Sequence, residues 1–184
     1  MTISLGDIFP NLKCKTNKGE VQIHDFIGHS WCLLFSHPYD FTPVCTSELA
    51  RAAQLAPEFA KRNVKLLALS CNDCEMHNAW IKDIQAYGNL DTAAEFPFSI
   101  IDDKCRTIAN KLGMLDQNET DSAGQPLTAR SVRKEESRLL SAYLFLLKTL
   151  FLLRFSSSGP TSVSSSLSFS RLRLVAISSR YSTL

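Results

Sequence analysis

Along the first 130 residues, short apolar runs alternate with longer segments in which apolar residues recur every three or four positions. The apolar runs predict buried strands, at Trp31–Phe35, Val64–Leu69 and Phe96–Ile101. The periodic segments predict helices, at Cys45–Arg62, Cys74–Tyr87 and Cys105–Leu112. A hairpin is predicted before them, over Lys13–Ile23. Strands that alternate with helices are typical of βαβ units, so we predict an α/β fold with parallel strands.

The composition of the chain changes near Arg130. Residues 131–184 contain fifteen serines in 54 positions, and they carry eight Lys or Arg against two Asp or Glu, a net charge of +6. Because the whole chain carries +2, the first 130 residues carry −4. We therefore predict a domain over residues 3–130 and a divergent, serine-rich, basic tail over 131–184.

Residues 139–155 within this tail are predominantly apolar but too short for a membrane span, which needs about 20 residues. Three alternatives stay open for them: a helix packed on the domain, disorder, or an amphipathic helix on a membrane surface. We expect no integral membrane segment.

Composition and charge give little indication of a macromolecular partner. A net charge of +2 does not favour nucleic acid as a partner, and the first residues lack the pattern of a signal peptide. The six cysteines are therefore expected in a reducing compartment, as free, catalytic or metal-binding thiols rather than disulfides. We predict a cytoplasmic protein.

Cys45 follows the predicted strand Trp31–Phe35 and opens the predicted helix. Unpaired N–H groups and the positive end of the helix dipole favour a thiolate at such a position. Thr42 supplies a hydroxyl one turn away, and Pro38 and Pro43 make the loop rigid. An isolated cysteine is more often a small buried apolar residue, but the Pro-x-x-x-Thr-x-x-Cys spacing favours a functional sulfur.

The stretch Pro38-Tyr39-Asp40-Phe41-Thr42-Pro43-Val44-Cys45 resembles the active-site motif of peroxiredoxins. The longer SHPYDFTPVCTSE, residues 36–48, and PLTAR, residues 126–130, are similar to the one-Cys, peroxiredoxin 6-like branch. The resemblance covers about residues 3–130 and implies a thioredoxin-like fold. The strands and the helix that complete the sheet in the family have no match after Arg130.

The resemblance implies roles for five residues. Cys45 would be the peroxidatic nucleophile, and Thr42 would hydrogen-bond the peroxide and the sulfur. Arg130 would close the site from a distant part of the chain. Pro38 would shield the pocket from water, and His37 would tune the cysteine.

The activity implied is reduction of hydrogen peroxide and organic hydroperoxides through a sulfenic acid on Cys45. No cysteine follows Cys105, so the resolving cysteine of two-Cys peroxiredoxins is absent and an external thiol is expected to regenerate the enzyme. The resemblance implies glutathione as that thiol, with a glutathione transferase as a partner, and a homodimer. No prosthetic cofactor and no metal are expected.

Two other constellations compete with Cys45 for a functional role. Cys71-Asn72-Asp73-Cys74 is a CxxC just before a predicted helix, and with His77 it offers three metal ligands, whereas a structural zinc site normally has four. We interpret these thiols as structural, with a redox role and a metal site as alternatives. Ser30 and His24 match positions to which the resemblance assigns a phospholipase A2 activity, but Cys32 replaces the last glycine of the nucleophile elbow.

The mismatch after Arg130 leaves a second hypothesis for the function of the chain. A splice form or a frameshift would leave one edge of the sheet exposed, which is an aggregation hazard. Such a product would be catalytically impaired, with at most a binding role.

Overall fold

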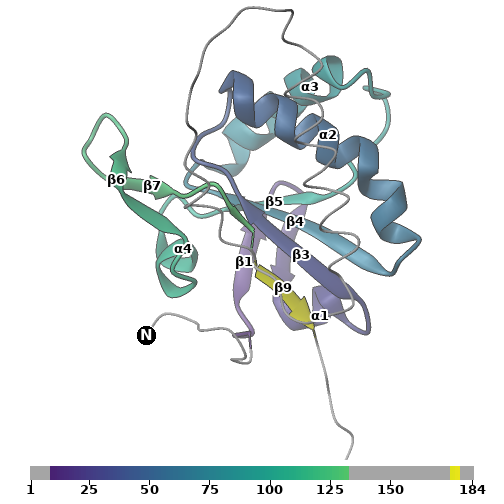
Figure 1. Cartoon of the computed structure of the whole chain (residues 1–184), viewed down its shortest axis with the longest axis horizontal. Coiled ribbons are helices and arrows are strands. Elements are labelled where there is room, and N and C mark those ends of the chain that lie inside the picture. Colours follow the sequence, from purple (N-terminus) through teal and green to yellow (C-terminus); the bar gives the residue numbers. More distant parts are fainter. Residues whose placement is uncertain (1–8, 133–174, 179–184) are drawn as a thin grey trace, which may run out of the picture.

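The computed structural model describes residues 9–132 and 175–178 (Figure 1). The strands of its main sheet are β1 (Lys13–Thr16), β2 (Gly19–Gln22), β3 (Trp31–Ser36), β4 (Val64–Ser70), β5 (Ser99–Asp102), β8 (Ser131–Val132) and β9 (Val175–Ser178). A separate two-stranded sheet consists of β6 (Leu115–Thr120) and β7 (Pro126–Thr128). The helices are α1 (Ile23–Ile27), α2 (Pro43–Ala60), α3 (Cys74–Tyr87) and α4 (Thr107–Lys111).

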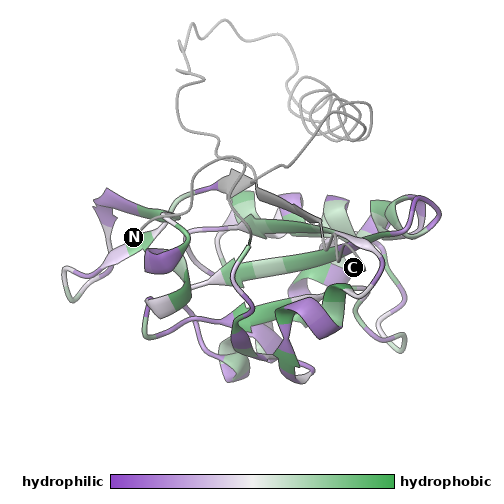
Figure 2. Cartoon of the chain, turned by 90° about the horizontal axis from the view of Figure 1, so that it is seen from below, coloured by the Kyte–Doolittle hydropathy of each residue, from purple (hydrophilic) through white to green (hydrophobic). Residues whose placement is uncertain are grey.

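The main sheet lies between two layers of helices. Its strand order is β2-β1-β5-β4-β3-β8, with β9 also paired to β3, and the central β3, β4 and β5 are parallel. Leu33 points to the face covered by α2 and α3, where it shares a hydrophobic cluster with Trp80. Leu34 points to the opposite face and clusters with Ile27 of α1 and Ala109 of α4. Figure 2 shows the central strands coloured as hydrophobic and the outer helices as mixed. The predicted α/β architecture is confirmed.

Most predicted elements match in place but not in extent. β3, β4 and α3 begin at the predicted residues, whereas β5 begins at Ser99 and not at Phe96. The rings of Phe96 and Phe98 pack edge to face in the core, 4.6 Å apart between centroids, so their apolar pattern reflects burial without strand pairing. The β6–β7 hairpin was not predicted because its strand β6 is polar and largely exposed.

The outer edge of β3 is paired with other strands, whereas an exposed sheet edge was expected. β8 pairs with Phe35 and Ser36, and β9 pairs antiparallel with the four residues from Trp31 to Leu34. A backbone ladder needs only an extended segment with free N–H and C=O groups, so an unrelated sequence can occupy this edge. The expectation was therefore wrong for this edge.

The domain boundary near Arg130 stays a prediction, and the segment 139–155 lies outside the described residues.

None of the helices in the described part of the chain has the length and apolar character needed to cross a membrane.

Two cysteine thiols in the core should make the fold sensitive to alkaline pH. Cys14 and Cys32 are buried against α1 and α4, and burial raises the pKa of Cys14 to about 11 and that of Cys32 to about 12, well above the value of an exposed thiol. Above about pH 9 the unfolded chain loses these protons while the folded chain keeps them, so the free energy of unfolding should fall as pH rises. Urea titrations at a series of pH values would measure this slope.

Cys32→Ala should flatten the alkaline slope, although the small cavity it leaves lowers stability at neutral pH. Cys105→Ser is the matched control because Cys105 is an exposed free thiol, and this variant should keep the slope of the unsubstituted chain. Identical slopes for Cys32→Ala and Cys105→Ser would contradict the explanation.

Candidate active site

Cys45 lies in the first turn of α2, at the carboxyl end of the central strand β3. The helix begins at Pro43, two residues earlier than predicted, with Thr42 as its N-cap. A proline suits this first position because its missing N–H would have no partner in the helix. Phe41, just before the cap, has φ 59°, a strained conformation for a bulky residue and one that is typical of functional loops.

The Arg130 guanidinium contacts the sulfur of Cys45 across 85 positions of sequence. Its Nη2 donates a hydrogen bond to Cys45 Sγ at 3.3 Å. The segment before Arg130 is fixed to the end of β3, because the Thr128 hydroxyl donates to the His37 carbonyl at 2.6 Å and the Ser36 hydroxyl donates to the Ala129 carbonyl at 2.5 Å. A cation and a helix N-terminus therefore meet at one sulfur, and both stabilise a thiolate.

Glu48 also binds the Arg130 guanidinium, and this partner was not predicted from the sequence. Glu48 Oε2 lies 3.0 Å from Arg130 Nε. The residue is three positions after Cys45, so the helix places both side chains on one face. That spacing was the available signal, since Glu48 is the last residue of the quoted SHPYDFTPVCTSE motif.

Thr42 and Pro38 lie beside the sulfur in sequence, but the predicted contact of Thr42 with sulfur is not formed among the described residues. The Thr42 hydroxyl donates to the Tyr39 carbonyl at 3.2 Å. Pro38 is half-buried where the chain leaves β3. The roles assigned to both residues stay predictions.

The sulfur is enclosed. Cys45 is 0% exposed, while the side chain of Arg130 is 40% exposed. Three apolar residues of the same loop and helix start are exposed, namely Tyr39, Phe41 and Val44. A peroxide must therefore displace neighbouring side chains to reach the sulfur.

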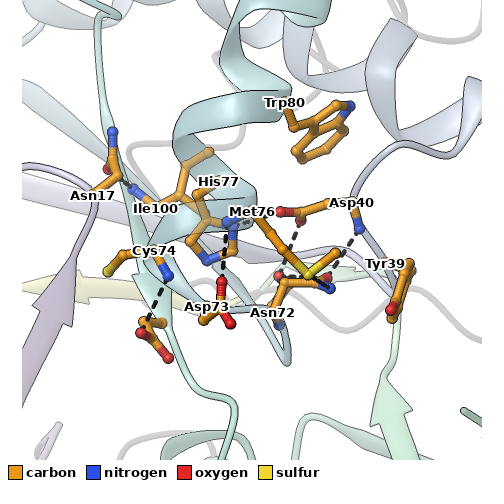
Figure 3. A network of polar contacts seen from close by, with 12 residues as sticks. Asn17, Tyr39, Asp40, Asn72, Asp73, Cys74, Met76, His77, Trp80 and Ile100 are labelled. Atoms are coloured by element: carbon orange, nitrogen blue, oxygen red, sulfur yellow. Dashed lines mark hydrogen bonds and ion pairs between the residues drawn. The ribbon is translucent and has the colours of Figure 1, made fainter.

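His37 belongs to a buried polar network that was not predicted from the sequence. Asp40 is its centre: Oδ1 lies 2.8 Å from His37 Nε2, and Oδ2 lies 2.6 Å from His77 Nδ1. The Ser70 hydroxyl donates to Oδ1 at 3.2 Å, and the backbone N–H of Asp40 donates to Asn72 Oδ1 at 3.0 Å. Figure 3 shows Asp40, Asn72 and His77 together beside Trp80.

The protonation of this network follows from burial and hydrogen bonding. Burial lowers the pKa of His37, so its imidazole is neutral at ordinary pH. Burial opposes ionisation of Asp40, but hydrogen bonds from His37 and His77 outweigh it and hold the pKa of Asp40 below its usual range. The network therefore contains a buried carboxylate between two imidazoles.

The structure does not assemble the competing CxxC site. Cys71 and Cys74 are free thiols, and burial raises the pKa of both, that of Cys74 to about 11. Neither is therefore a ready thiolate. Both ring nitrogens of His77 are engaged, by Asp40 and by the Ile101 carbonyl at 3.1 Å, and the described residues contain no group of three potential metal ligands.

Ser30 and His24, the two residues that match the phospholipase motif, also form hydrogen bonds with other partners. The Ser30 hydroxyl donates to Asn63 Oδ1 at 2.8 Å, and His24 Nε2 contacts the Phe9 carbonyl at 2.8 Å. Neither contact joins Ser30 to His24, so no base for Ser30 is found among the residues that the structure describes.

Comparison with known proteins identifies the family of this site. The model of the AhpC/TSA family matches residues 5–139. The chain belongs to the AhpC/TSA family. Human peroxiredoxin-6 is 59% identical over 128 residues, which is 70% of this chain and 57% of that protein. The chain thus spans little more than half the length of this curated AhpC/TSA relative.

Solved structures of AhpC/TSA relatives confirm the thioredoxin-like fold. The crystal structure of a mutant of Arenicola marina peroxiredoxin 6 superposes with a TM-score of 0.69 at 34% identity, covering 90% of this chain and 80% of that one. A yeast mitochondrial one-Cys peroxiredoxin gives a TM-score of 0.63 at 32% identity, covering 89% and 84%. The predicted similarity to the one-Cys, peroxiredoxin 6-like branch is confirmed.

Proposed function

We propose that the chain is a thiol peroxidase that reduces hydrogen peroxide and organic hydroperoxides through Cys45. The observation that carries this proposal is the hydrogen bond of 3.3 Å from Arg130 Nη2 to Cys45 Sγ at the N-terminus of α2. An activated cysteine beside oriented donors is suited to attack on a polarisable O–O bond. Membership of the AhpC/TSA family supports the same reaction class.

In the proposed reaction the Cys45 thiolate attacks the terminal oxygen of the hydroperoxide. The S–O bond forms as the O–O bond breaks, the alkoxide leaves and takes up a proton, and Cys45 keeps the hydroxyl as a sulfenic acid. Arg130 and Thr42 stabilise the charge that develops on the two oxygens. Pro38 excludes water from the sulfur, and His37 tunes its reactivity.

An external thiol then reduces the sulfenic acid. The yeast one-Cys peroxiredoxin structure concerns thiol resolution through glutathione and thioredoxin systems, and we extend the glutathione route to this chain. We further propose that a glutathione transferase delivers the glutathione. The chain would act as a homodimer and be located in the cytoplasm.

Peroxide titration of the intact chain tests the proposal, and Cys105 is an internal control. After one equivalent of hydrogen peroxide and trapping with a sulfenic-acid reagent, peptide mass spectrometry should find the modification on Cys45. Cys105 is exposed whereas Cys45 is fully buried, so accessibility alone would oxidise Cys105 first. Preferential oxidation of Cys45 therefore reports activation by the site.

Oxidation of Cys105 ahead of Cys45 would contradict the peroxidase. It would favour the alternative of a catalytically impaired product, which rests on the mismatch of the sequence with the family after Arg130.

A further inference from the structure

The β6–β7 hairpin brings the chain to Arg130 but belongs to no larger sheet in the described part of the chain. Its two strands pair with each other, with Leu115 opposite Thr128. Figure 1 shows the hairpin beside α4, at the side of the main sheet. A two-stranded hairpin is at best marginally stable alone. Side-chain contacts must therefore fix its position and that of Arg130, which follows the end of β7 by two residues.

The Arg106 guanidinium provides such contacts. Its Nε donates to the Pro126 carbonyl at 2.7 Å, and its Nη2 donates to Asp121 Oδ2 at 2.5 Å. Its Nη1 donates to the Lys104 carbonyl at 3.0 Å. Asp121 directly follows β6 and Pro126 begins β7, whereas Lys104 lies in the loop after β5. Arg106 therefore joins both sides of the hairpin turn to the end of the main sheet.

The backbone conformation of Arg106 indicates that its side chain is needed at this position. The residue precedes α4 with φ 58° and ψ 15°, in the left-handed region. A side chain disfavours this region because its Cβ approaches the carbonyl oxygen, so glycine would suit the position better. Such strained residues persist where surrounding contacts determine their conformation, and they are frequent at functional sites. Backbone geometry alone does not explain an arginine here, whereas the three contacts of its guanidinium do.

The backbone after Pro126 leads directly to the candidate site. The Ala129 N–H donates to the carbonyl of Met114, which directly precedes β6, at 2.7 Å. The next residue is Arg130, whose Nη2 lies 3.3 Å from Cys45 Sγ. The hairpin is thus held near its turn by Arg106 and at its base by this backbone bond. A shift of the hairpin would move Arg130, and a displacement of about 1 Å can cost on the order of a hundredfold in rate.

Resting on the proposed peroxidase function, we propose that Arg106 is a positioning residue for the reaction at Cys45. Its contacts with Pro126 and Asp121 fix the β6–β7 hairpin. The fixed hairpin holds the Arg130 guanidinium against the sulfur before the peroxide arrives. Arg106 touches neither sulfur nor peroxide and acts through Arg130. If its contacts merely stabilised the fold, its loss would not depend on Arg130.

A double-mutant cycle tests the action of Arg106 through Arg130. Arg106→Gly removes the guanidinium and suits the left-handed backbone, so it tests the side chain with little backbone disturbance. It should lower the second-order rate of Cys45 oxidation by roughly threefold to thirtyfold. In an Arg130→Ala background the same substitution should change the rate by less than about twofold, because its target is gone. Equal losses in both backgrounds, or no loss in either, would overturn the proposal.

Arg62→Gly is the matched control for Arg106→Gly. The Arg62 Nη1 also donates to a carbonyl and a carboxylate, those of Glu58, at 2.7 and 3.2 Å. It lies just beyond the end of α2, opposite to the end that carries Cys45, so its substitution should leave the rate unchanged. An equal loss in this control would overturn the proposal. If Arg106→Gly does not fold, Asp121→Asn replaces it in the cycle, with the same expectations.

Hydrogen exchange measured by mass spectrometry follows the hairpin independently of peroxide. Peptides from residues 115–130 should exchange roughly tenfold faster in Arg106→Gly than in the unsubstituted chain, because the hairpin opens more often. Peptides from β3 and β4 should not change. Unchanged exchange of the hairpin would overturn the positioning proposal even in an active peroxidase. Faster exchange of the hairpin, in a chain whose Cys45 does not react with peroxide before substitution, would instead overturn the proposed function.

Discussion

Replacing Arg130 by alanine is expected to lower the second-order rate of Cys45 with peroxide by about 10²–10³-fold, the usual cost of losing one oriented donor to a developing oxyanion. The guanidinium lies 3.3 Å from the sulfur and is fixed by Glu48 and by the hydrogen bonds of Thr128 and Ala129 to the end of β3. It is therefore oriented before the peroxide arrives. Stopped-flow kinetics under pseudo-first-order conditions would measure the rate.

Loss of the thiolate cannot by itself produce an effect of this size. A free thiol with a pKa of about 8.5 is a few per cent ionised at neutral pH, so complete ionisation raises the reactive fraction by about 30-fold at most. A more stable thiolate is also a weaker nucleophile, which reduces the benefit. The larger part of the Arg130 contribution must therefore act on the oxygens in the transition state.

Two variants separate these contributions. Arg130→Lys keeps a positive charge near the sulfur but loses the planar fork of donors, so it should retain most of the thiolate and still lose most of the rate. Glu48→Gln removes the ion pair that fixes Arg130 and should have an intermediate effect. If the rate loss in Arg130→Ala merely equals the loss of thiolate absorbance at the same pH, transition-state stabilisation is refuted.

The sequence predicted those parts of the fold that depend on local pattern. β3, β4 and α3 have clear apolar periodicity, and their first residues were predicted correctly. α1 was not predicted, because Ile23 also continues the alternation of apolar and polar residues in the preceding strand. A helix of five residues also leaves little periodic signal. The pairing of β9 with β3 depends on backbone hydrogen bonds between distant segments, which the side-chain pattern does not encode.

The candidate site, too, was predicted from the sequence only in part. The resemblance identified the residues near Cys45 and also Arg130, whose contact with the sulfur the structure forms. Asp40 lies inside the quoted motif, yet nothing in the motif indicates that His77, 37 positions later, binds its carboxylate. Such pairs arise because β3 and β4 end at the same edge of the sheet and α3 begins there, a juxtaposition that requires the topology.

Trp80→Ala is expected to cause the largest loss of stability of any single substitution considered, about 3–5 kcal/mol. Trp80 belongs to α3 and is fully buried against α2, and its ring lies 5.0 Å from that of His37 and 6.4 Å from that of Phe41. Its Nε1 donates to Thr46 Oγ1 at 3.0 Å. Alanine would leave a large cavity under the loop that carries the candidate site.

Urea unfolding followed by far-ultraviolet circular dichroism would measure this loss. Trp80→Phe keeps an aromatic ring but removes the donor to Thr46, so it should cost less than alanine. Trp31→Ala is the matched control because Trp31, the other tryptophan of the chain, is only partly buried and leaves a smaller cavity. Because Trp80 joins the core to the His37 ring, its loss should also slow oxidation of Cys45 in the molecules that remain folded. A Trp80→Ala chain no less stable than Trp31→Ala would contradict this description of the core.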